Sequence, residues 1–148
     1  MRPGVFVIAL VIAAVLWWLM SMSLDAASEP DEEVIATGAR VYAENCAACH
    51  GADLAGEADW QTRDADGYLP APPHDETGHT WHHPTAQLID ITTRGTEAIV
   101  GGGYKSRMPG FADTLSEDEI AAVIAYIKST WPAQIRRRHD EMDAALTR

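Results

Sequence analysis

The only two cysteines of this 148-residue chain lie three positions apart, and a histidine follows directly, in the run Cys46-Ala47-Ala48-Cys49-His50. On a helix, this spacing brings both thiols to one face, about one turn apart. There, each thiol can form a thioether bond to one of the two vinyl groups at a haem edge, while the imidazole of His50 reaches the iron as its proximal ligand. The run therefore predicts covalent attachment of one c-type haem through Cys46 and Cys49.

Two other uses of a cysteine pair fit the surrounding residues less well. A thioredoxin-like redox pair follows a strand in a βαβ unit, whereas the residues before Cys46 have a helical pattern. A zinc site would recruit His79 and His83, whose spacing is common among zinc ligands. However, 29 residues separate Cys49 from His79, against about 12 to 15 in a compact zinc finger. A zinc site would also leave His50 without a role.

The run Ser106-Arg107-Met108-Pro109-Gly110 lies far downstream of the cysteines. Taken with Cys46 to Gly51, it resembles class I cytochromes c, over roughly residues 32–131. The resemblance implies an all-α domain around one covalently bound haem c, with His50 and Met108 as axial ligands. A methionine thioether raises the reduction potential relative to a nitrogen ligand, which suits an electron carrier. The alternative is that Met108 fills the core and leaves the iron open or bound by a histidine.

An apolar segment, Val5 to Leu24, precedes this region and is interrupted only by two serines, with Arg2 as its flanking positive side chain. About 20 residues are enough to cross a bilayer as a helix. We therefore predict that residues 1–24 are one N-terminal transmembrane helix and that residues 25–31 are a polar linker. The positive-inside rule then places the haem domain on the periplasmic side of a bacterial cytoplasmic (inner) membrane. The alternative is a cleaved signal peptide, with Ser21-Met22-Ser23 near the cut.

Local patterns predict helices at both ends of the haem domain. Residues 32–45 form the first, and the resemblance implies that its Gly38 and Tyr42 cross against the last helix of the domain. Ser116 and Glu119 form a capping box that begins this last helix. It ends or kinks at Trp131-Pro132.

Two further helices are predicted outside this pair. One opens at Pro84, which is tolerated at the first helical position, and closes at Gly95. The other is a charged helical tail over residues 132–148, which we expect to be solvated. Its three consecutive arginines, Arg136 to Arg138, could instead contact anionic lipid or an acidic partner.

Residues 52–78 are mostly loop, rich in Asp, Gly and Pro. The resemblance implies that a proline carbonyl in this loop accepts the other ring N–H of His50, which fixes the tautomer of the ligand. Pro72 and Pro73 are both candidates. The next stretch, residues 74–83, carries four histidines and two carboxylates. It could bind copper or zinc, or be a structural loop whose polar side chains bond the haem propionates or the backbone.

The formal net charge is −11, and all 22 acidic residues lie between Asp25 and Asp143. Such a domain is repelled by nucleic acid, so a nucleic-acid partner is excluded. If charge steers encounters, it favours redox partners with a basic docking face.

Together these features predict a membrane-tethered, monohaem single-electron carrier that passes electrons between respiratory or other redox partners. We expect no small-molecule substrate and no enzyme activity of the isolated chain, because its Ser, His and carboxylate residues show no triad order. Two alternatives belong to other classes: a haem-linked sensor or haem enzyme subunit with an open iron site, and a copper- or zinc-binding module using residues 74–83. A nested alternative makes the electron carrier a subunit of an oxidase or dehydrogenase complex.

Overall fold

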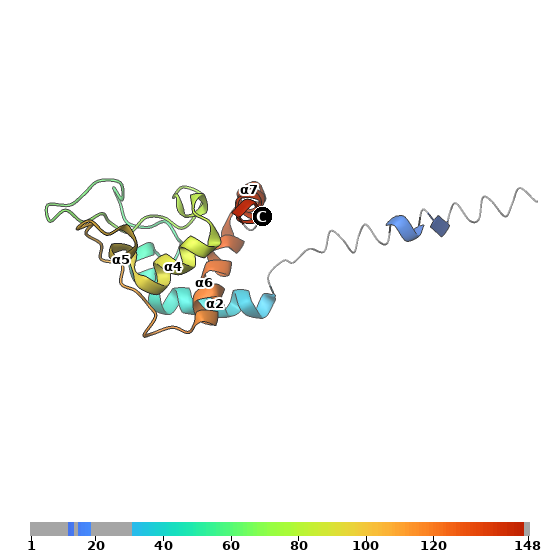
Figure 1. Cartoon of the computed structure of the whole chain (residues 1–148), viewed down its shortest axis with the longest axis horizontal. Coiled ribbons are helices and arrows are strands. Elements are labelled where there is room, and N and C mark those ends of the chain that lie inside the picture. Colours follow the sequence, from blue (N-terminus) through green and yellow to red (C-terminus); the bar gives the residue numbers. More distant parts are fainter. Residues whose placement is uncertain (1–11, 14, 19–30, 147–148) are drawn as a thin grey trace, which may run out of the picture. The chain divides into compact units, whose positions relative to one another are not determined.

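The computed structural model describes residues 12–13, 15–18 and 31–146. The chain divides into two units, Met1–Asp31 and Glu32–Arg148, which are treated separately (Figure 1). In the first unit residues 12–13 and 15–18 are helical, and the side chain of Trp17 is exposed. Among the described residues, no helix has both the length and the apolar character needed to cross a membrane. Most of the predicted anchor, residues 1–24, lies outside the described residues, so the anchor stays a prediction.

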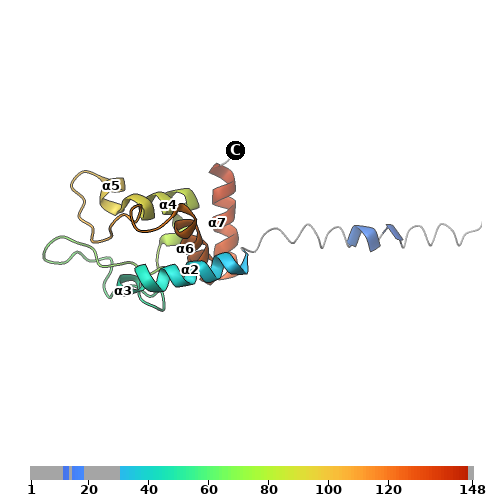
Figure 2. The ribbon, with the colours of Figure 1, turned by 90° about the horizontal axis from the view of Figure 1, so that it is seen from below.

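The second unit is built from helices joined by long loops, and its described residues contain no strand. This confirms the all-α class. The elements in chain order are α2 (Glu32–Asn45), α3 (Ala47–His50), the 3-10 turn η1 (Thr80–His82), α4 (Thr85–Arg94), α5 (Thr96–Val100), α6 (Glu117–Thr130) and α7 (Ala133–Leu146). The long loops and α7 lie at opposite ends of this unit (Figures 1 and 2).

The centre of the unit is the crossing of α2 and α6. A Cβ on Gly38 would lie 2.0 Å from the carbonyl oxygen of Ala122 and 2.7 Å from Cβ of Tyr126, so only glycine allows this approach. One turn further along α2, the rings of Tyr42 and Tyr126 lie 5.5 Å apart. The crossing implied by the resemblance is therefore confirmed. The cysteine motif begins at Cys46, directly after the last residue of α2.

Local signals predicted the ends of α6 correctly. The Ser116 hydroxyl accepts from the Glu119 N–H at 3.2 Å, and the Glu119 carboxylate accepts from the Ser116 N–H at 3.1 Å, which completes the capping box. Trp131 is the C-cap, and Pro132 stands before α7. The buried core beside α6 consists of Val41, Tyr42, Leu54, Leu88, Val123, Ile124, Ile127 and Trp131.

The predicted start of α4 is shifted by one residue. Pro84 is the N-cap in extended conformation, and Thr85 is the first helical residue. Pro84 has no side-chain oxygen with which to cap the helix. The Asp143 carboxylate of α7 fills this role, since it accepts from the Thr85 N–H at 2.8 Å and from the Thr85 hydroxyl at 2.6 Å. A carboxylate at a helix N-terminus is favourable, so α7 stabilises α4.

The tail is helical as predicted, but the expectation that it is solvated is wrong for one face of α7. His139 is 1% exposed, and its Nε2 donates to the His83 carbonyl at 2.9 Å. Its ring also lies 5.1 Å from the Trp131 ring. The tail therefore packs against the end of α6 and the segment before α4.

Candidate haem site

The two cysteines lie at the junction of α2 and α3. Cys46 is the N-cap of α3, and its carbonyl accepts from the His50 N–H at 2.9 Å. This single turn sets the spacing of the thiols and the histidine. Cys46 and Cys49 are free thiols; Cys49 is exposed and Cys46 is half-buried. Burial, followed by the neighbouring Cys49 thiol, raises the pKa of Cys46 to about 11, so this thiol is protonated at neutral pH.

The His50 side chain is arranged as a metal ligand. It is 7% exposed, and its Nδ1 lies 2.8 Å from the Pro72 carbonyl oxygen. A carbonyl oxygen only accepts, so Nδ1 carries the proton and Nε2 keeps its lone pair. Burial lowers the pKa of His50, although the Pro72 carbonyl acts in the opposite direction. The structure therefore assigns the acceptor to Pro72 and not to Pro73, and it presents a neutral imidazole with one free nitrogen.

A glycine contact positions the Pro72 carbonyl. A Cβ on Gly56 would lie 2.6 Å from both the Pro72 carbonyl carbon and the Pro73 nitrogen, and Gly56 has a φ of +68°. The Gly56 N–H donates to the His50 carbonyl at 2.8 Å. The chain after Cys49 and His50 thus makes a tight turn that brings Gly56 next to both His50 and Pro72. Glycine is needed here for both the conformation and the close approach.

The histidine-rich loop, residues 74–83, uses its rings mainly for stacking. The His74 ring stacks on His50, His79 on Trp60 and His82 on Trp81. The Trp81 indole donates to the Glu76 carbonyl at 3.3 Å, a backbone bond of the kind expected for a structural loop. In the part of the chain that the structure describes, no group of three metal-ligating side chains lies in this loop.

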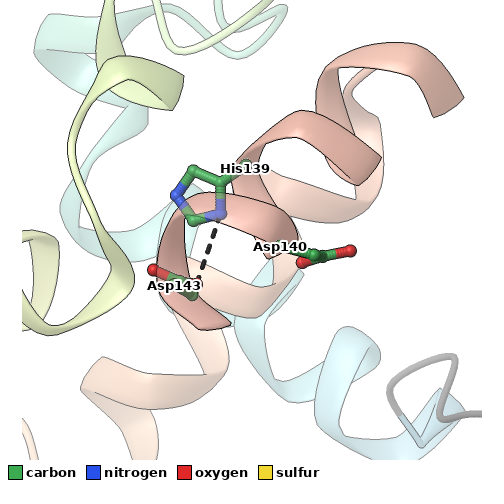
Figure 3. Close-up of side chains that lie close together, drawn as sticks. All are labelled: His139, Asp140 and Asp143. Carbon is green, nitrogen blue, oxygen red and sulfur yellow. Dashed lines mark ion pairs between the residues drawn. The ribbon is translucent and has the colours of Figure 1, made fainter. Parts of the chain in front are cut away.

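Such a group lies instead on α7, where ligand atoms of His139, Asp140 and Asp143 all fall within 4.8 Å of one another (Figure 3). The Lys128 ammonium already lies 3.2 Å from the Asp143 carboxylate and 3.4 Å from the Asp140 carboxylate. It also donates to the Thr85 hydroxyl at 3.1 Å. The Lys128 ammonium therefore supplies the positive charge opposite these carboxylates. Through Lys128 and Thr85, these contacts hold α7 against α6 and the start of α4.

Met108, the predicted second axial ligand, lies against the end of α4. A Cβ on Gly95 would lie 3.3 Å from the Met108 carbonyl oxygen and 2.8 Å from the Gly110 nitrogen. The Thr96 hydroxyl lies 3.5 Å from the Met108 sulfur, and the Met108 N–H donates to the Ser106 hydroxyl at 3.0 Å. The thioether is half-buried. Its role as an iron ligand stays a prediction.

A latch of polar and aromatic side chains joins the Met108 segment to the long loop before it. The Arg107 guanidinium pairs with the Asp64 carboxylate and lies 4.2 Å from the centre of the Tyr68 ring. Next to it, the Lys105 ammonium donates to the Asp66 carbonyl at 2.7 Å. We call these five residues the loop latch. Sequence reasoning missed it, because nothing local indicates that positions about 40 apart meet.

The residues present fit a covalently held haem. Two free thiols one turn apart match two vinyl groups, and His50 offers a neutral nitrogen whose other ring N–H is bonded to a carbonyl, the arrangement usual for a ligating histidine. Met108 adds a soft thioether in a half-buried position.

Comparisons with known proteins agree with this chemistry. The sequence model of the family described as Cytochrome c matches residues 35–131. The chain is 30% identical over 95 residues to the cbb3-type cytochrome c oxidase subunit FixP of Sinorhizobium medicae, covering 64% of this chain and 29% of that protein. It is 29% identical over 96 residues to the gluconate 2-dehydrogenase cytochrome c subunit of Pantoea cypripedii, covering 64% of this chain and 20% of that protein. The chain thus matches less than a third of the length of each relative.

Among solved structures, cytochrome cL of Methylophaga aminisulfidivorans is similar, with a TM-score of 0.49 and 22% identity. The match covers 78% of this chain and 69% of that one.

Proposed function

The chain belongs to the cytochrome c family, and we propose that it is a single-electron carrier with His50 and Met108 as axial iron ligands. The cofactor of the family is covalently bound haem c, and Cys46 and Cys49 form the matching attachment motif. When bound, the haem iron supplies reversible one-electron chemistry.

The observation that carries this proposal is the 2.8 Å contact between Nδ1 of His50 and the Pro72 carbonyl. It holds the ring in one tautomer, in which Nε2 keeps its lone pair. A proton on Nε2 would compete with the iron, and burial of His50 acts against that proton by lowering the pKa of the ring. Pro72 therefore keeps His50 ready as a ligand, and Cys46 and Cys49 would hold the haem covalently.

The proposed partners are redox proteins. The two relatives are named as subunits of an oxidase and of a dehydrogenase, which supports a place next to, or within, a respiratory complex. We propose that the isolated chain is not an enzyme and that its catalytic partners are separate chains.

The competing function is that of a haem-linked sensor or haem enzyme subunit, which needs an open iron site. Met108 distinguishes the two functions, because as an axial ligand it would close that site.

We also propose that residues 1–24 tether the chain to the periplasmic face of the cytoplasmic membrane. The support is the apolar segment Val5 to Leu24 with Arg2 at its start. Haem-stained gels of separated membrane and soluble fractions test this. The full chain should be in the membrane fraction, whereas recovery in the soluble fraction with an N-terminus near residue 25 would indicate cleavage.

Optical spectra of the full chain, made in a host that attaches c-type haem, test the electron-carrier proposal. We expect a low-spin haem that is unchanged by carbon monoxide in the reduced state. Met108→Ala should lose the methionine–ferric charge-transfer band and bind carbon monoxide, and Met142→Ala on α7 is the control that should do neither. A wild-type haem that is high-spin and binds carbon monoxide would support the sensor or enzyme alternative. Absence of covalent haem would contradict the whole assignment.

A further inference from the structure

His74 is the side chain that lies face to face with the proposed proximal ligand. The ring centres of His74 and His50 are 3.9 Å apart, and the two ring planes differ by 17°. This is direct stacking, because parallel rings at such a distance are in van der Waals contact. Nothing in the ligand set requires a second histidine here, since the tautomer of His50 is already set by Pro72.

Both backbone polar groups of His74 are held. Its N–H donates to the Leu54 carbonyl at 2.8 Å, and its carbonyl accepts from the Trp131 indole N–H at 2.7 Å. Trp131 is 2% exposed and is the C-cap of α6. The ring of Tyr42 meets His74 edge-on at 5.9 Å. His74 is thus attached to α6 and α2, the helix pair that forms the rigid centre of the unit.

The imidazole of His74 contacts its surroundings through its ring face more than through its nitrogen atoms. Within residues 31–146, its Nδ1 is buried and has no hydrogen-bond partner. A buried polar atom without a partner is unfavourable, so hydrogen bonding through this nitrogen does not explain the position of the ring. The stacking contact with His50 does.

A ligating imidazole can rotate about the bond from its Nε2 to the metal. The Nδ1 contact with Pro72 restrains this rotation from the edge of the ring, and a parallel ring at 3.9 Å restrains it from the face. We propose that His74 is a positioning residue that fixes the rotational orientation of the His50 imidazole. This inference rests on the proposed function, in which His50 is an axial ligand.

Electron paramagnetic resonance of the ferric full-length protein tests the inference, because the g values of a low-spin haem depend on the orientation of the axial imidazole plane. The unmodified protein should give one narrow low-spin signal. His74→Ala removes the face contact and should broaden this signal or shift its largest g value. His74→Phe keeps an aromatic face in a somewhat larger ring and removes both nitrogens, of which Nδ1 has no hydrogen-bond partner, so its g values should stay near those of the wild type.

His79→Ala is the matched control. It also removes one imidazole from the same loop, but this ring stacks on Trp60, 5.2 Å away. Its spectrum should equal that of the wild type, although its thermal stability can fall. If His74→Ala is less stable yet keeps the wild-type g values, or if His79→Ala shifts them equally, the inference is overturned.

Two more outcomes separate this inference from the proposed function. Should His74→Ala fail to retain haem, His74→Phe decides: one narrow low-spin signal with the g values of the wild type supports the inference, and a broadened or shifted signal overturns it. A wild-type protein without low-spin haem overturns the proposed function itself and, with it, this inference.

Discussion

Gly38 is the residue on which the crossing of α2 and α6 depends. In the middle of a helix a glycine costs about 1 kcal/mol relative to alanine, so Gly38→Ala would stabilise an isolated helix. In the folded chain the added Cβ would lie 2.0 Å from the Ala122 carbonyl oxygen, which is backbone and cannot turn aside. We expect Gly38→Ala to lower the free energy of unfolding by about 2 kcal/mol or more, measured by chemical denaturation.

The control for Gly38 is the reverse change on the exposed face of the same helix. Ala36 is exposed, so Ala36→Gly should cost only about 1 kcal/mol through helix propensity. A Gly38→Ala variant as stable as the wild type would show that the two helices can separate without penalty.

At the scale of elements, α7 is docked by a buried histidine. The groups facing His139 are Lys128 on α6, Asp140 and Asp143 on α7, the His83 carbonyl and the Trp131 ring. Burial, followed by the Lys128 ammonium, lowers the pKa of His139 below its ordinary value of 6.5. The ring is therefore neutral in the folded state at neutral pH.

This lowered pKa predicts the sign of a pH dependence. Unfolded His139 takes up a proton as the pH falls below about 6.5, while folded His139 resists it, so the unfolded state binds more protons and stability is lost on acidification. Denaturation curves between pH 7.5 and 5.5 should show this loss. His139→Gln, whose amide can still donate to the His83 carbonyl, should reduce the slope by up to about 1.4 kcal/mol per pH unit. An unchanged slope would mean that His139 takes up its proton over the same pH range in the folded and unfolded states.

The loop latch joins two loop segments that lie about 40 positions apart in the sequence. The Arg107–Asp64 pair is exposed, so its loss should change global stability little. Locally the effect should be larger, because Arg107 also covers the Tyr68 ring and directly precedes Met108. We expect Arg107→Gln to accelerate amide hydrogen exchange around Met108 and Tyr68.

Arg40→Gln is the control for the latch. Arg40 of α2 forms similarly exposed ion pairs with Glu44 and with Glu119 of α6, so this variant loses ion pairs that lie outside both loops. If both variants exchange at the same rate around Met108, the latch does not hold that segment.

At the scale of the whole molecule, the formal net charge of −11 should govern electron-transfer kinetics. Charge attraction accelerates encounters with cations and is screened by salt. Stopped-flow oxidation by a small cationic reagent should therefore slow as ionic strength rises, and oxidation by an anionic reagent such as ferricyanide should accelerate. The same salt trend for both reagents would show that a local patch, and not the net charge, faces the reagent.

Local chemistry made part of this protein predictable from its sequence. The attachment motif, the capping box at Ser116 and Glu119, and the helix ends at Asn45 and Trp131 depend on residues within a few positions of one another. Helical hydrogen bonds, capping contacts and the spacing of the two thiols all involve residues within about one helical turn. The sequence by itself therefore determined the all-α class, the haem and the place where it is attached.

Tertiary structure decided every choice that joins distant positions. The acceptor for His50 is Pro72 and not its neighbour, the face of that ring is covered by His74, and α7 is docked through His139. Each contact joins residues between 22 and 56 positions apart. Local propensities do not encode such pairs, because their geometry depends on how α2 and α6 cross and on how the loops close around that crossing.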